Sequence, residues 1–420
     1  MAAADLASPG LWLRPMVNDK GGTQVKRMVQ EVVVVDAVRT AFGRAGEKGI
    51  FWKTRAEDLS VAVLRALVAR NSAVTAGMIE DVIWGATNQI GEQGGTIGRM
   101  ISMLADWGWE IPGCSLDRMC AGGLTAVGFA ATAIAAGTAD CLIAGGVEHM
   151  GHLPMGYMRD NHPRAEMALG DKTAFNMGLT AENIHDRFPE FTREMSDAYA
   201  LESQQKAAKA IRAGKMKGMI VPIKVTLADG SEILADTDQH PRPDTTLEGL
   251  AALPPPFRED GRVTAGNASG LNDGAAAVLL MSREKADSLG IQPAMRWVST
   301  GVAAVDPRVM GTAPVPATEK ALQRAGLKID DIDIIELNEA FAVQALYDLD
   351  RLGIDFRDAR VNPWGGAIAY GHPLAASGPR LVAFMKGHFK ENPDLRFGLT
   401  TMCVGRGQGY TMIWENLMRS

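Results

Sequence analysis

The order of apolar and polar positions predicts that short strands alternate with amphipathic helices after residue 30. Residues 31–36 form a β-branched run that is typical of a buried strand. Residues 56–70 carry apolar side chains at helical spacing on one face, and residues 82–85 return to a strand pattern. Helices that alternate with short apolar strands indicate a layered α/β fold.

Part of this pattern occurs twice. Residues 64–84 and residues 321–337 both show a helix, an acidic turn and a strand, in that order. Each half of the chain also has a helix that opens in a glycine-rich turn after a strand, first from Cys120 and then from Gly371. Two matches in the same order indicate a duplicated fold.

Residues 151–261 separate the two halves and are richer in methionine, charge and proline. Within them, residues 196–213 have the pattern of an amphipathic surface helix, with Ser196 as its N-cap. We interpret the segment as a lobe inserted over the edge of the duplicated core. Residues 1–30 lack both periodicity and the apolar core of a signal peptide, so we expect an extension without a catalytic role.

Composition narrows the class of protein. The 420 residues are 46% apolar and 22% charged, which is typical of a soluble globular chain with two or three packed units. A net charge of −6 argues against nucleic-acid binding, and no apolar run reaches the ~18 residues of a membrane span. The four cysteines show neither a CxxC pair nor metal-ligand spacing, so we expect no disulfide framework, no metal and a cytoplasmic location.

Four side chains are candidates for chemistry. Cys120 precedes a helix of small residues, and a thiol at a helix N-terminus favours the thiolate, although core cysteines are common. His372 lies in a glycine-rich turn before a helix, as a catalytic base or a structural histidine. Cys403 ends a strand before a turn whose N–H groups could hold an oxyanion, or it is a core residue. Asn338 opens a helix, where capping is the simpler role.

Together these segments resemble the active-site segments of thiolases. The matching motifs are Cys120, the Asn-Glu-Ala-Phe of residues 338–341, the Gly-His-Pro of residues 371–373 and the Cys-x-Gly of residues 403–405. The sequence also resembles further motifs of this family at residues 145–152, 263–277 and 306–311. The match runs in order from about residue 32 to residue 416. Residues 145–152 and 402–409 are most similar to the degradative thiolase subunit of bacterial fatty-acid oxidation.

The resemblance implies a fold and its domains. Two homologous halves are expected to pack as a five-layer α-β-α-β-α core, with a loop domain that shapes the acyl and CoA tunnel. The expected domains are an N-terminal extension (1–30), an N-terminal half (31–150 and 262–291), a loop domain (151–261) and a C-terminal half (292–420).

The same resemblance implies roles for the four side chains. His372 is expected to activate Cys120, whose thiolate attacks the 3-oxo carbon of a 3-oxoacyl-CoA. Cys403 then protonates the departing acetyl-CoA enolate and deprotonates the CoA that removes the acyl group. His372 with a water held by Asn338 is expected to stabilise one oxyanion. The backbone N–H groups of Cys120 and Gly405 are expected to stabilise the other.

Binding residues and partners follow by resemblance too. Arg242 and Ser269 fall where the family contacts CoA, and Met177, Met310 and Phe341 fall where it lines the pantetheine and acyl channel, unless they are core residues. We therefore expect CoA as a co-substrate, with no cofactor bound permanently. A homodimer or homotetramer is expected, and the resemblance allows a second protein subunit of a degradation complex.

The chain departs from the family pattern close to the predicted site. Asp117 replaces an asparagine, Gly122 a serine, Ala375 a frequent glycine and Arg406 a glycine or apolar residue, and Trp364 precedes the glycine pair. These departures are either neutral or they adapt the acyl pocket to a branched, aromatic or carboxylated chain. A serine lost at position 122 is expected to open space, and Arg406 could pair with a substrate carboxylate.

The predicted function is thiolytic cleavage of a 3-oxoacyl-CoA by an acyltransferase. The alternatives are a thiolase for an unusual acyl chain, a biosynthetic acetoacetyl-CoA thiolase, a ketoacyl synthase and a scaffold paralogue. Ketoacyl synthases share the fold but commonly complete the site with two histidines, or with a histidine and an asparagine, so Cys403 favours a thiolase. A scaffold would be expected to lose Cys120, His372 or Cys403, and all three are present.

Overall fold

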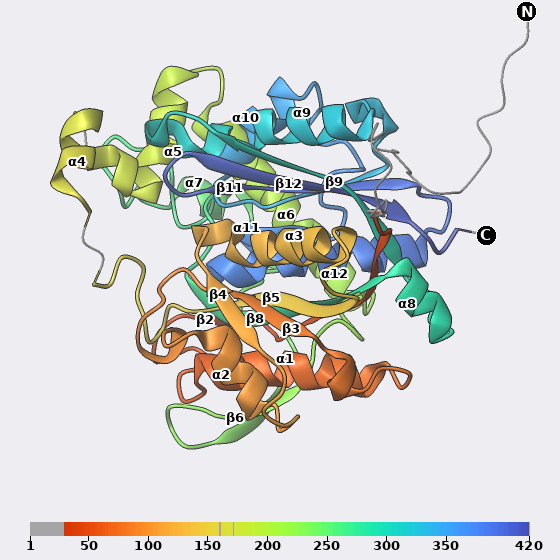
Figure 1. Ribbon diagram of the computed structural model, residues 1–420. Coiled ribbons are helices and arrows are strands. Elements are labelled where there is room, and N and C mark those ends of the chain that lie inside the picture. The colour runs from red at the N-terminus through yellow and green to blue at the C-terminus, as the bar shows by residue number, and fades with distance from the viewer. Residues whose placement is uncertain (1–28, 159–160, 171, 420) are drawn as a thin grey trace, which may run out of the picture.

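The computed structural model describes residues 29–158, 161–170 and 172–419 (Figure 1). The predicted extension at residues 1–30 therefore lies almost wholly outside the described residues. Nine strands follow one another across a single sheet in the order β10-β11-β12-β9-β1-β8-β5-β3-β4, and β2 pairs with β8 beside this path. Their bounds are β1 (Val32–Arg39), β2 (Gly43–Arg44), β3 (Asp81–Gly85), β4 (Gly113–Leu116), β5 (Cys141–His149), β8 (Asn272–Ser282), β9 (Met295–Ala304), β10 (Ile334–Leu337), β11 (Phe397–Val404) and β12 (Gln408–Asn416).

The sheet contains the same arrangement of four strands twice. β1 pairs antiparallel with β8, β8 antiparallel with β5, and β5 parallel with β3. In the other half, β9 pairs antiparallel with β12, β12 antiparallel with β11, and β11 parallel with β10. The halves join where β1 and β9 pair at only two positions, Val33 with Arg296 and Val34 with Met295. The duplication predicted from the sequence is therefore confirmed.

Helices cover both outer faces of the sheet and fill the space between its halves (Figure 1). α1 (Ala56–Arg70) and α2 (Ile97–Leu104) lie outside the N-terminal half, and α9 (Pro314–Ala325) and α10 (Ala342–Arg351) lie outside the C-terminal half. Between the halves lie α3 (Gly122–Ala135), α11 (Ala367–Tyr370) and α12 (Leu374–Glu391). This order is the five-layer α-β-α-β-α core predicted by resemblance.

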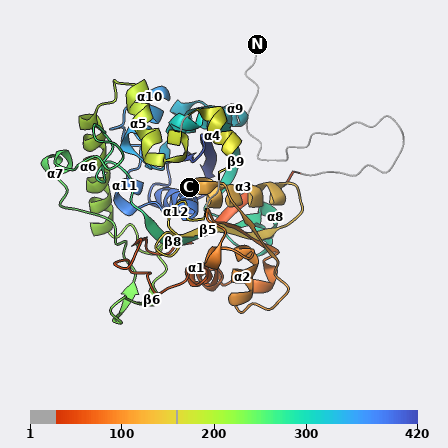
Figure 2. The same cartoon turned by 90° about the vertical axis from the view of Figure 1, so that its left-hand side faces the viewer.

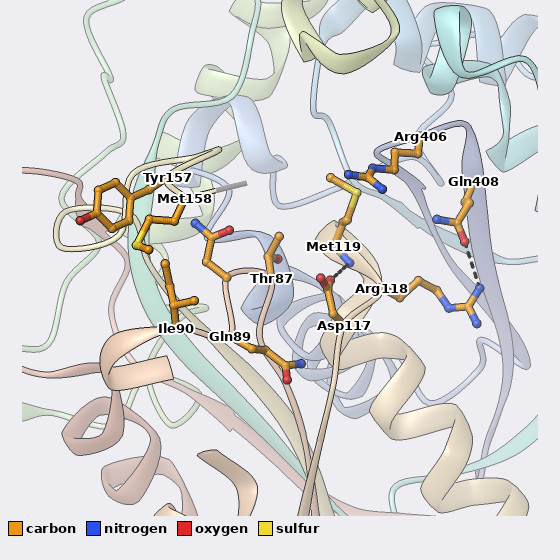
Figure 3. Close-up of a pocket in the computed structure, with 11 residues that line it drawn as sticks. Thr87, Gln89, Ile90, Asp117, Arg118, Met119, Tyr157, Met158, Arg406 and Gln408 are labelled. Atoms are coloured by element: carbon orange, nitrogen blue, oxygen red, sulfur yellow. Dashed lines mark hydrogen bonds between the residues drawn. The ribbon is translucent and has the colours of Figure 1, made fainter. Parts of the chain in front are cut away.

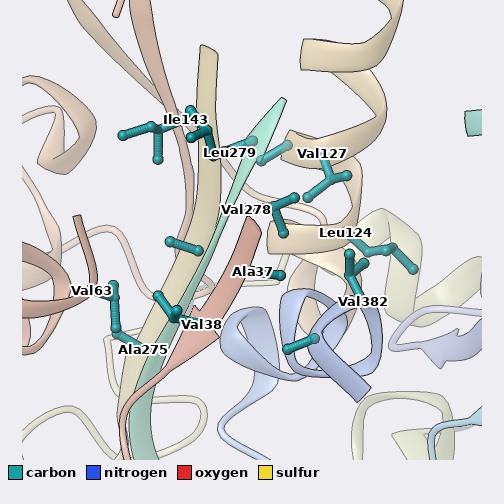
Figure 4. Close-up of a cluster of buried hydrophobic side chains, with 14 of the residues drawn as sticks. Ala37, Val38, Val63, Leu124, Val127, Ile143, Ala275, Val278, Leu279 and Val382 are labelled. Carbon is teal, nitrogen blue, oxygen red and sulfur yellow. The ribbon is translucent and has the colours of Figure 1, made fainter. Parts of the chain in front are cut away.

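Small residues let the two long central helices approach each other closely. A Cβ added at Gly123 of α3 would lie 2.2 Å from the carbonyl oxygen of Ala375, and one at Gly378 of α12 would lie 2.5 Å from Leu124. Apolar side chains from β1, β8, α3 and α12 fill the remaining space (Figure 4). Burial on this scale is the main stabilising contribution to the core.

The lobe is inserted in the chain between β5 and β8. It contains α4 (Pro163–Leu169), α5 (Met177–Arg187), α6 (Arg193–Arg212), α7 (Leu247–Ala251) and the β6–β7 hairpin (Ile223–Thr226 and Glu232–Ala235). Figure 2 shows α6 and α7 to one side of the core, near α11. In the described ranges, no helix combines the length and the apolar character needed to cross a membrane.

One local prediction for the lobe is wrong. The helix expected from residue 196 is α6, but it begins at Arg193, and its N-cap is Thr192, whose side chain accepts a hydrogen bond from the Met195 N–H. Ser196 lies inside the helix and is buried. Both residues are good N-caps, and the start after Thr192 adds the helical positions 193–196.

Candidate active site

Cys120 lies where the chain enters the central helix α3. It belongs to a 3-10 turn, Met119–Ala121, that runs directly into α3, and its side chain is buried. Met119 has a φ of 44°, a left-handed conformation that costs a non-glycine residue about 1–3 kcal/mol. The Met119 N–H donates to the Asp117 carboxylate at 2.6 Å. Asp117, one of the departures from the family pattern, thus stabilises the turn that presents Cys120.

His372 occupies the corresponding position in the other half, directly before α12. Gly371 has a φ of 96°, and an added Cβ there would lie 2.3 Å from the Asn272 side chain, so a glycine is required. The Asn272 side-chain oxygen accepts the His372 N–H at 3.0 Å, and the imidazole Nδ1 lies 2.6 Å from the Ser377 hydroxyl. These contacts fix both the backbone and the ring.

The environment keeps the imidazole of His372 neutral. Burial lowers its pKa to about 3, and the positive charge of Arg380 also lowers it. A neutral imidazole has one N–H donor and one free acceptor nitrogen. It can therefore accept a proton from a thiol or donate its N–H to an oxyanion.

Asn338 follows β10 and is fully buried against the imidazole. Its amide nitrogen lies 3.5 Å from both ring nitrogens of His372, so it contacts the ring without pairing with one of them. Its amide oxygen accepts a hydrogen bond from Arg380 at 3.4 Å, which orients the amide. The capping alternative is wrong, because α10 begins at Ala342 and its N-cap is Phe341.

Cys403 lies near the end of β11 and is fully buried. Burial raises the pKa of its thiol well above the ordinary value, and negative charge on Cys120 and Asp348 raises it further. A thiol in this state is a proton donor. The turn that carries Cys120 packs against β11, which ends near Cys403.

The turn that carries Cys120 packs against both α12 and β11. The turn after β11 lies close as well, since a Cβ added at Gly405 would be 2.5 Å from the Met119 side chain and 3.4 Å from the Met177 sulfur. The structure therefore brings four of the predicted catalytic segments, and Met177, into one place.

The other predicted binding residues lie in three places. Ser269 and Phe341 are close to each other, because the Ser269 N–H donates to the Ala340 carbonyl oxygen at 2.9 Å. Arg242 lines a separate cavity of about 440 Å³ formed mainly by the lobe. Met310 is 2% exposed and belongs to the core of the C-terminal half, which matches the core alternative for that residue.

A second cavity, of about 450 Å³, adjoins Met119 (Figure 3). Two of the departures from the family pattern, Asp117 and Arg406, form part of its wall together with their neighbours in the chain. The lining residues are Thr87, Asn88, Gln89, Ile90, Asp117, Arg118, Met119, Tyr157, Met158, Arg406 and Gln408. None of them lines the cavity of Arg242.

The expectation that Gly122 opens space is wrong. A Cβ added at Gly122 would lie 3.2 Å from the Cβ of Ala375. The methyl group of Ala375 therefore occupies the room that a larger side chain at position 122 would need. Two departures that are 253 positions apart in the chain compensate for each other across the interface of the two halves.

Two buried carboxylates near the site carry no role in the sequence analysis. Glu148 accepts hydrogen bonds from Thr87, Asn88, Gln93 and Ala375, and so ties the N-terminal half to the first turn of α12. Glu339 accepts from Tyr199, Ser203, Asn362 and Ile368 beside Asn338. Burial raises the pKa of both carboxyls. Their motif positions were visible in the sequence, but their partners lie far away in the chain.

A cluster of Glu92, His149 and His152 was also missed. Their potential ligand atoms all lie within 4.8 Å of one another. The Nε2 atoms of the two stacked imidazoles lie 3.1 and 2.7 Å from the carbonyl oxygens of Phe51 and Trp52. These contacts join the loop before α1 to the loop after β5.

The duplicated five-layer core carries Cys120 and the neutral His372 at the starts of its central helices and Cys403 near the end of β11, and this arrangement is that of a thiolase-type acyltransferase. Comparisons with known proteins agree. Family models described as "Thiolase, N-terminal domain" and "Thiolase, C-terminal domain" match residues 32–284 and 291–416. The chain belongs to the thiolase family, and it is therefore an acyltransferase.

Named relatives are similar over nearly the whole chain. The 3-ketoacyl-CoA thiolases of Pectobacterium carotovorum subsp. carotovorum (strain PC1) and Serratia proteamaculans (strain 568) are each 44% identical over 391 residues, which is 93% of this chain and 100% of theirs. The crystal structure of the Bacillus anthracis acetyl-CoA acetyltransferase matches with a TM-score of 0.83 and 36% identity, over 92% of this chain and 99% of that one.

Proposed function

We propose that this thiolase cleaves a 3-oxoacyl-CoA with CoA, releasing acetyl-CoA and an acyl-CoA shortened by two carbons. The observation that carries the proposal is the packing of the Cys120 turn against α12, which follows His372, and β11, which ends near Cys403. A nucleophile, a base and a separate acid are the groups that this reaction requires. The names of the 3-ketoacyl-CoA thiolases at 44% identity support the same reaction.

In the first half-reaction, the neutral His372 takes the proton of Cys120, and the thiolate attacks the 3-oxo carbon. A bond forms between the sulfur and this carbon, and the C2–C3 bond then breaks. Its electron pair goes to the acetyl-CoA enolate, which Cys403 protonates at C2. The protonated state of the Cys403 thiol supports this role as an acid.

In the second half-reaction, the Cys403 thiolate takes the proton of an incoming CoA thiol. The CoA sulfur attacks the acyl carbon, and the bond to Cys120 breaks. Backbone N–H groups of Cys120 and Gly405 are proposed to stabilise the oxyanion on the acyl thioester. His372, with a water held by Asn338, is proposed to stabilise the other oxyanion. One lost donor at such a site costs about a hundredfold or more in rate.

CoA is proposed as a co-substrate, without a permanently bound cofactor or a metal. Arg242, in the lobe cavity, is proposed to contact its anionic end, and Ser269, Phe341 and Met177 are proposed to lie along its pantetheine arm. We further propose that the protein forms a homodimer or homotetramer in the cytoplasm and that this assembly can bind a second protein subunit of a degradation complex. The limits of the two halves and the loop domain stay predictions.

The test is to identify the acylated cysteine. After brief exposure to a 3-oxoacyl-CoA, mass spectrometry should find the acyl group on the peptide of Cys120, and acetyl-CoA should be released. A Cys120→Ala protein should form no adduct. An adduct confined to Cys114, Cys141 or Cys403 would refute the assignment of the nucleophile.

The name of the Bacillus anthracis relative supports the reverse reaction, condensation of two acetyl-CoA molecules, as a second candidate. The two candidates differ in the acyl group that the enzyme accepts. A preference for acetoacetyl-CoA over all longer 3-oxoacyl-CoAs would favour the condensing enzyme.

A further inference from the structure

The cavity beside Met119 has an apolar side and a side with two arginines, and it is also lined by Asp117, whose carboxylate accepts the Met119 N–H. In Figure 3, Ile90, Tyr157 and Met158 lie on one side, and Arg118 and Arg406 lie on the other. Tyr157 is 51% exposed and Met158 is 77% exposed, so apolar surface remains uncovered there. A ligand that covers this surface and also reaches the arginines would have a short hydrocarbon part and an anionic end.

The two arginines retain the capacity to bind an anion. Within the described part of the chain, neither Arg118 nor Arg406 forms an ion pair. Arg118 donates to the neutral amide of Gln408 at 3.3 Å, and its Nε is buried without a hydrogen-bond partner. Arg406 donates to the neutral amide of Asn161 at 2.9 Å. Guanidinium groups with neutral partners favour a carboxylate, which they bind with two parallel hydrogen bonds.

Arg406 lines this cavity with an uncommon backbone conformation. Its φ of 67° is left-handed, which is uncommon for a residue with a side chain, and Gly405 and Gly407 flank it. Gly405 lies against Met119, the residue before the proposed nucleophile. A group bound by Arg406 would therefore be tethered close to the acyl carbon.

We propose that this cavity is a subsite for an acyl chain that ends in a carboxylate, so that the substrates are 3-oxoacyl-CoAs of dicarboxylic acids. This inference rests on the proposed function. The cavity adjoins the residue before Cys120 and shares no lining residue with the cavity of Arg242. If CoA extends toward Arg242, the acyl chain has this cavity available. An unsubstituted alkyl tail would lie against largely polar walls, which is unfavourable.

The test compares two substrates of equal length, 3-oxohexanoyl-CoA and its ω-carboxylated counterpart 3-oxoadipoyl-CoA. We expect the wild-type protein to have the higher kcat/KM with the carboxylated substrate. In Arg406→Gln, the ratio of the two kcat/KM values should fall about ten- to a hundredfold, the usual worth of a charged hydrogen bond. Arg406→Lys should restore part of the ratio. Arg212→Gln, at the exposed end of α6, is the matched control and should leave the ratio unchanged.

Each other outcome has a definite meaning. A ratio that Arg406→Gln does not change refutes the subsite. An equal fall with both substrates, together with a higher KM for CoA, assigns Arg406 to a CoA phosphate and also refutes it. If the wild-type protein releases acetyl-CoA from neither substrate, the proposed function itself fails, and the subsite fails with it.

Discussion

Gly122 and Ala375 provide a direct test of how the two halves of the thiolase core fit together. The perturbation is Gly122→Ser, which introduces the residue that is common in the family. Gly122 has a φ of −51°, which any residue adopts, so packing alone decides the outcome. The new Cβ would lie 3.2 Å from the Ala375 Cβ, which is closer than the roughly 3.5–4.0 Å of an ordinary carbon–carbon contact.

The expected loss of stability follows from this contact. Overpacking in a tight core costs about 1–3 kcal/mol, and the better helix propensity of serine over glycine recovers roughly 0.5 kcal/mol. Gly122→Ser should therefore destabilise the fold by about 0.5–2.5 kcal/mol. Ala375→Gly alone should cost up to about 1 kcal/mol through helix propensity. In the double variant the close contact is absent, so we expect a favourable coupling of about 1–2 kcal/mol.

The assay is a double-mutant cycle in urea, with kcat measured for all four proteins. The contact that Gly122→Ser disturbs lies between α3 and α12, which begin beside Cys120 and His372. We therefore expect kcat to fall in the single variant and to recover in the double variant. Gly77→Ser is the control, because nothing lies within 4 Å of a Cβ at that position. Single-variant costs that add to within about 0.5 kcal/mol would refute the compensation.

Further predictions concern the catalytic groups and the assembly. Cys403→Ser should still acquire the acyl group on Cys120, but its turnover should fall by ~10²–10⁴-fold, and near-normal turnover would exclude acid–base catalysis by Cys403. In the folded protein the pKa of His372 is about 3, below the ordinary value of 6.5. Between pH 6.5 and pH 3 the imidazole therefore binds a proton only in the unfolded chain, so the free energy of unfolding falls as the pH drops through this range. His372→Asn should show a weaker acid loss in urea titrations, and an unchanged pH dependence would contradict the reasoning. Arg380→Met should raise the pKa of His372 and so move the acid limb of the kcat/KM profile to higher pH. It should also lower kcat, because the Asn338 amide loses the donor that orients it. A pH profile like that of the wild type would show that Arg380 does not control the pKa of His372. Light scattering at micromolar concentration should show at least a dimer, and a monomer would refute the expected assembly.

The sequence is informative where structure depends on neighbouring residues. α1 spans the residues 56–70 that the apolar spacing predicts, and the strands expected at residues 31–36 and 82–85 are present as β1 and β3. Local signals are weaker where two caps compete, as at Thr192 and Ser196. They carry no information about contacts between distant residues. Arg380 orients Asn338 from 42 positions away, and Ala375 fills the space beside Gly122 from the other half.

The duplication explains why each candidate catalytic residue is ambiguous alone. α3 belongs to the N-terminal half and α12 to the C-terminal half, and the two helices pack against each other between the halves of the sheet. Their N-termini carry Cys120 and His372, and a helix N-terminus has a partial positive charge of roughly 0.5 that favours a thiolate and disfavours an imidazolium. One helix start with a cysteine or a histidine is common in proteins. Here the turn that carries Cys120 packs against the helix that follows the neutral His372, and this pairing exists only once both halves have folded.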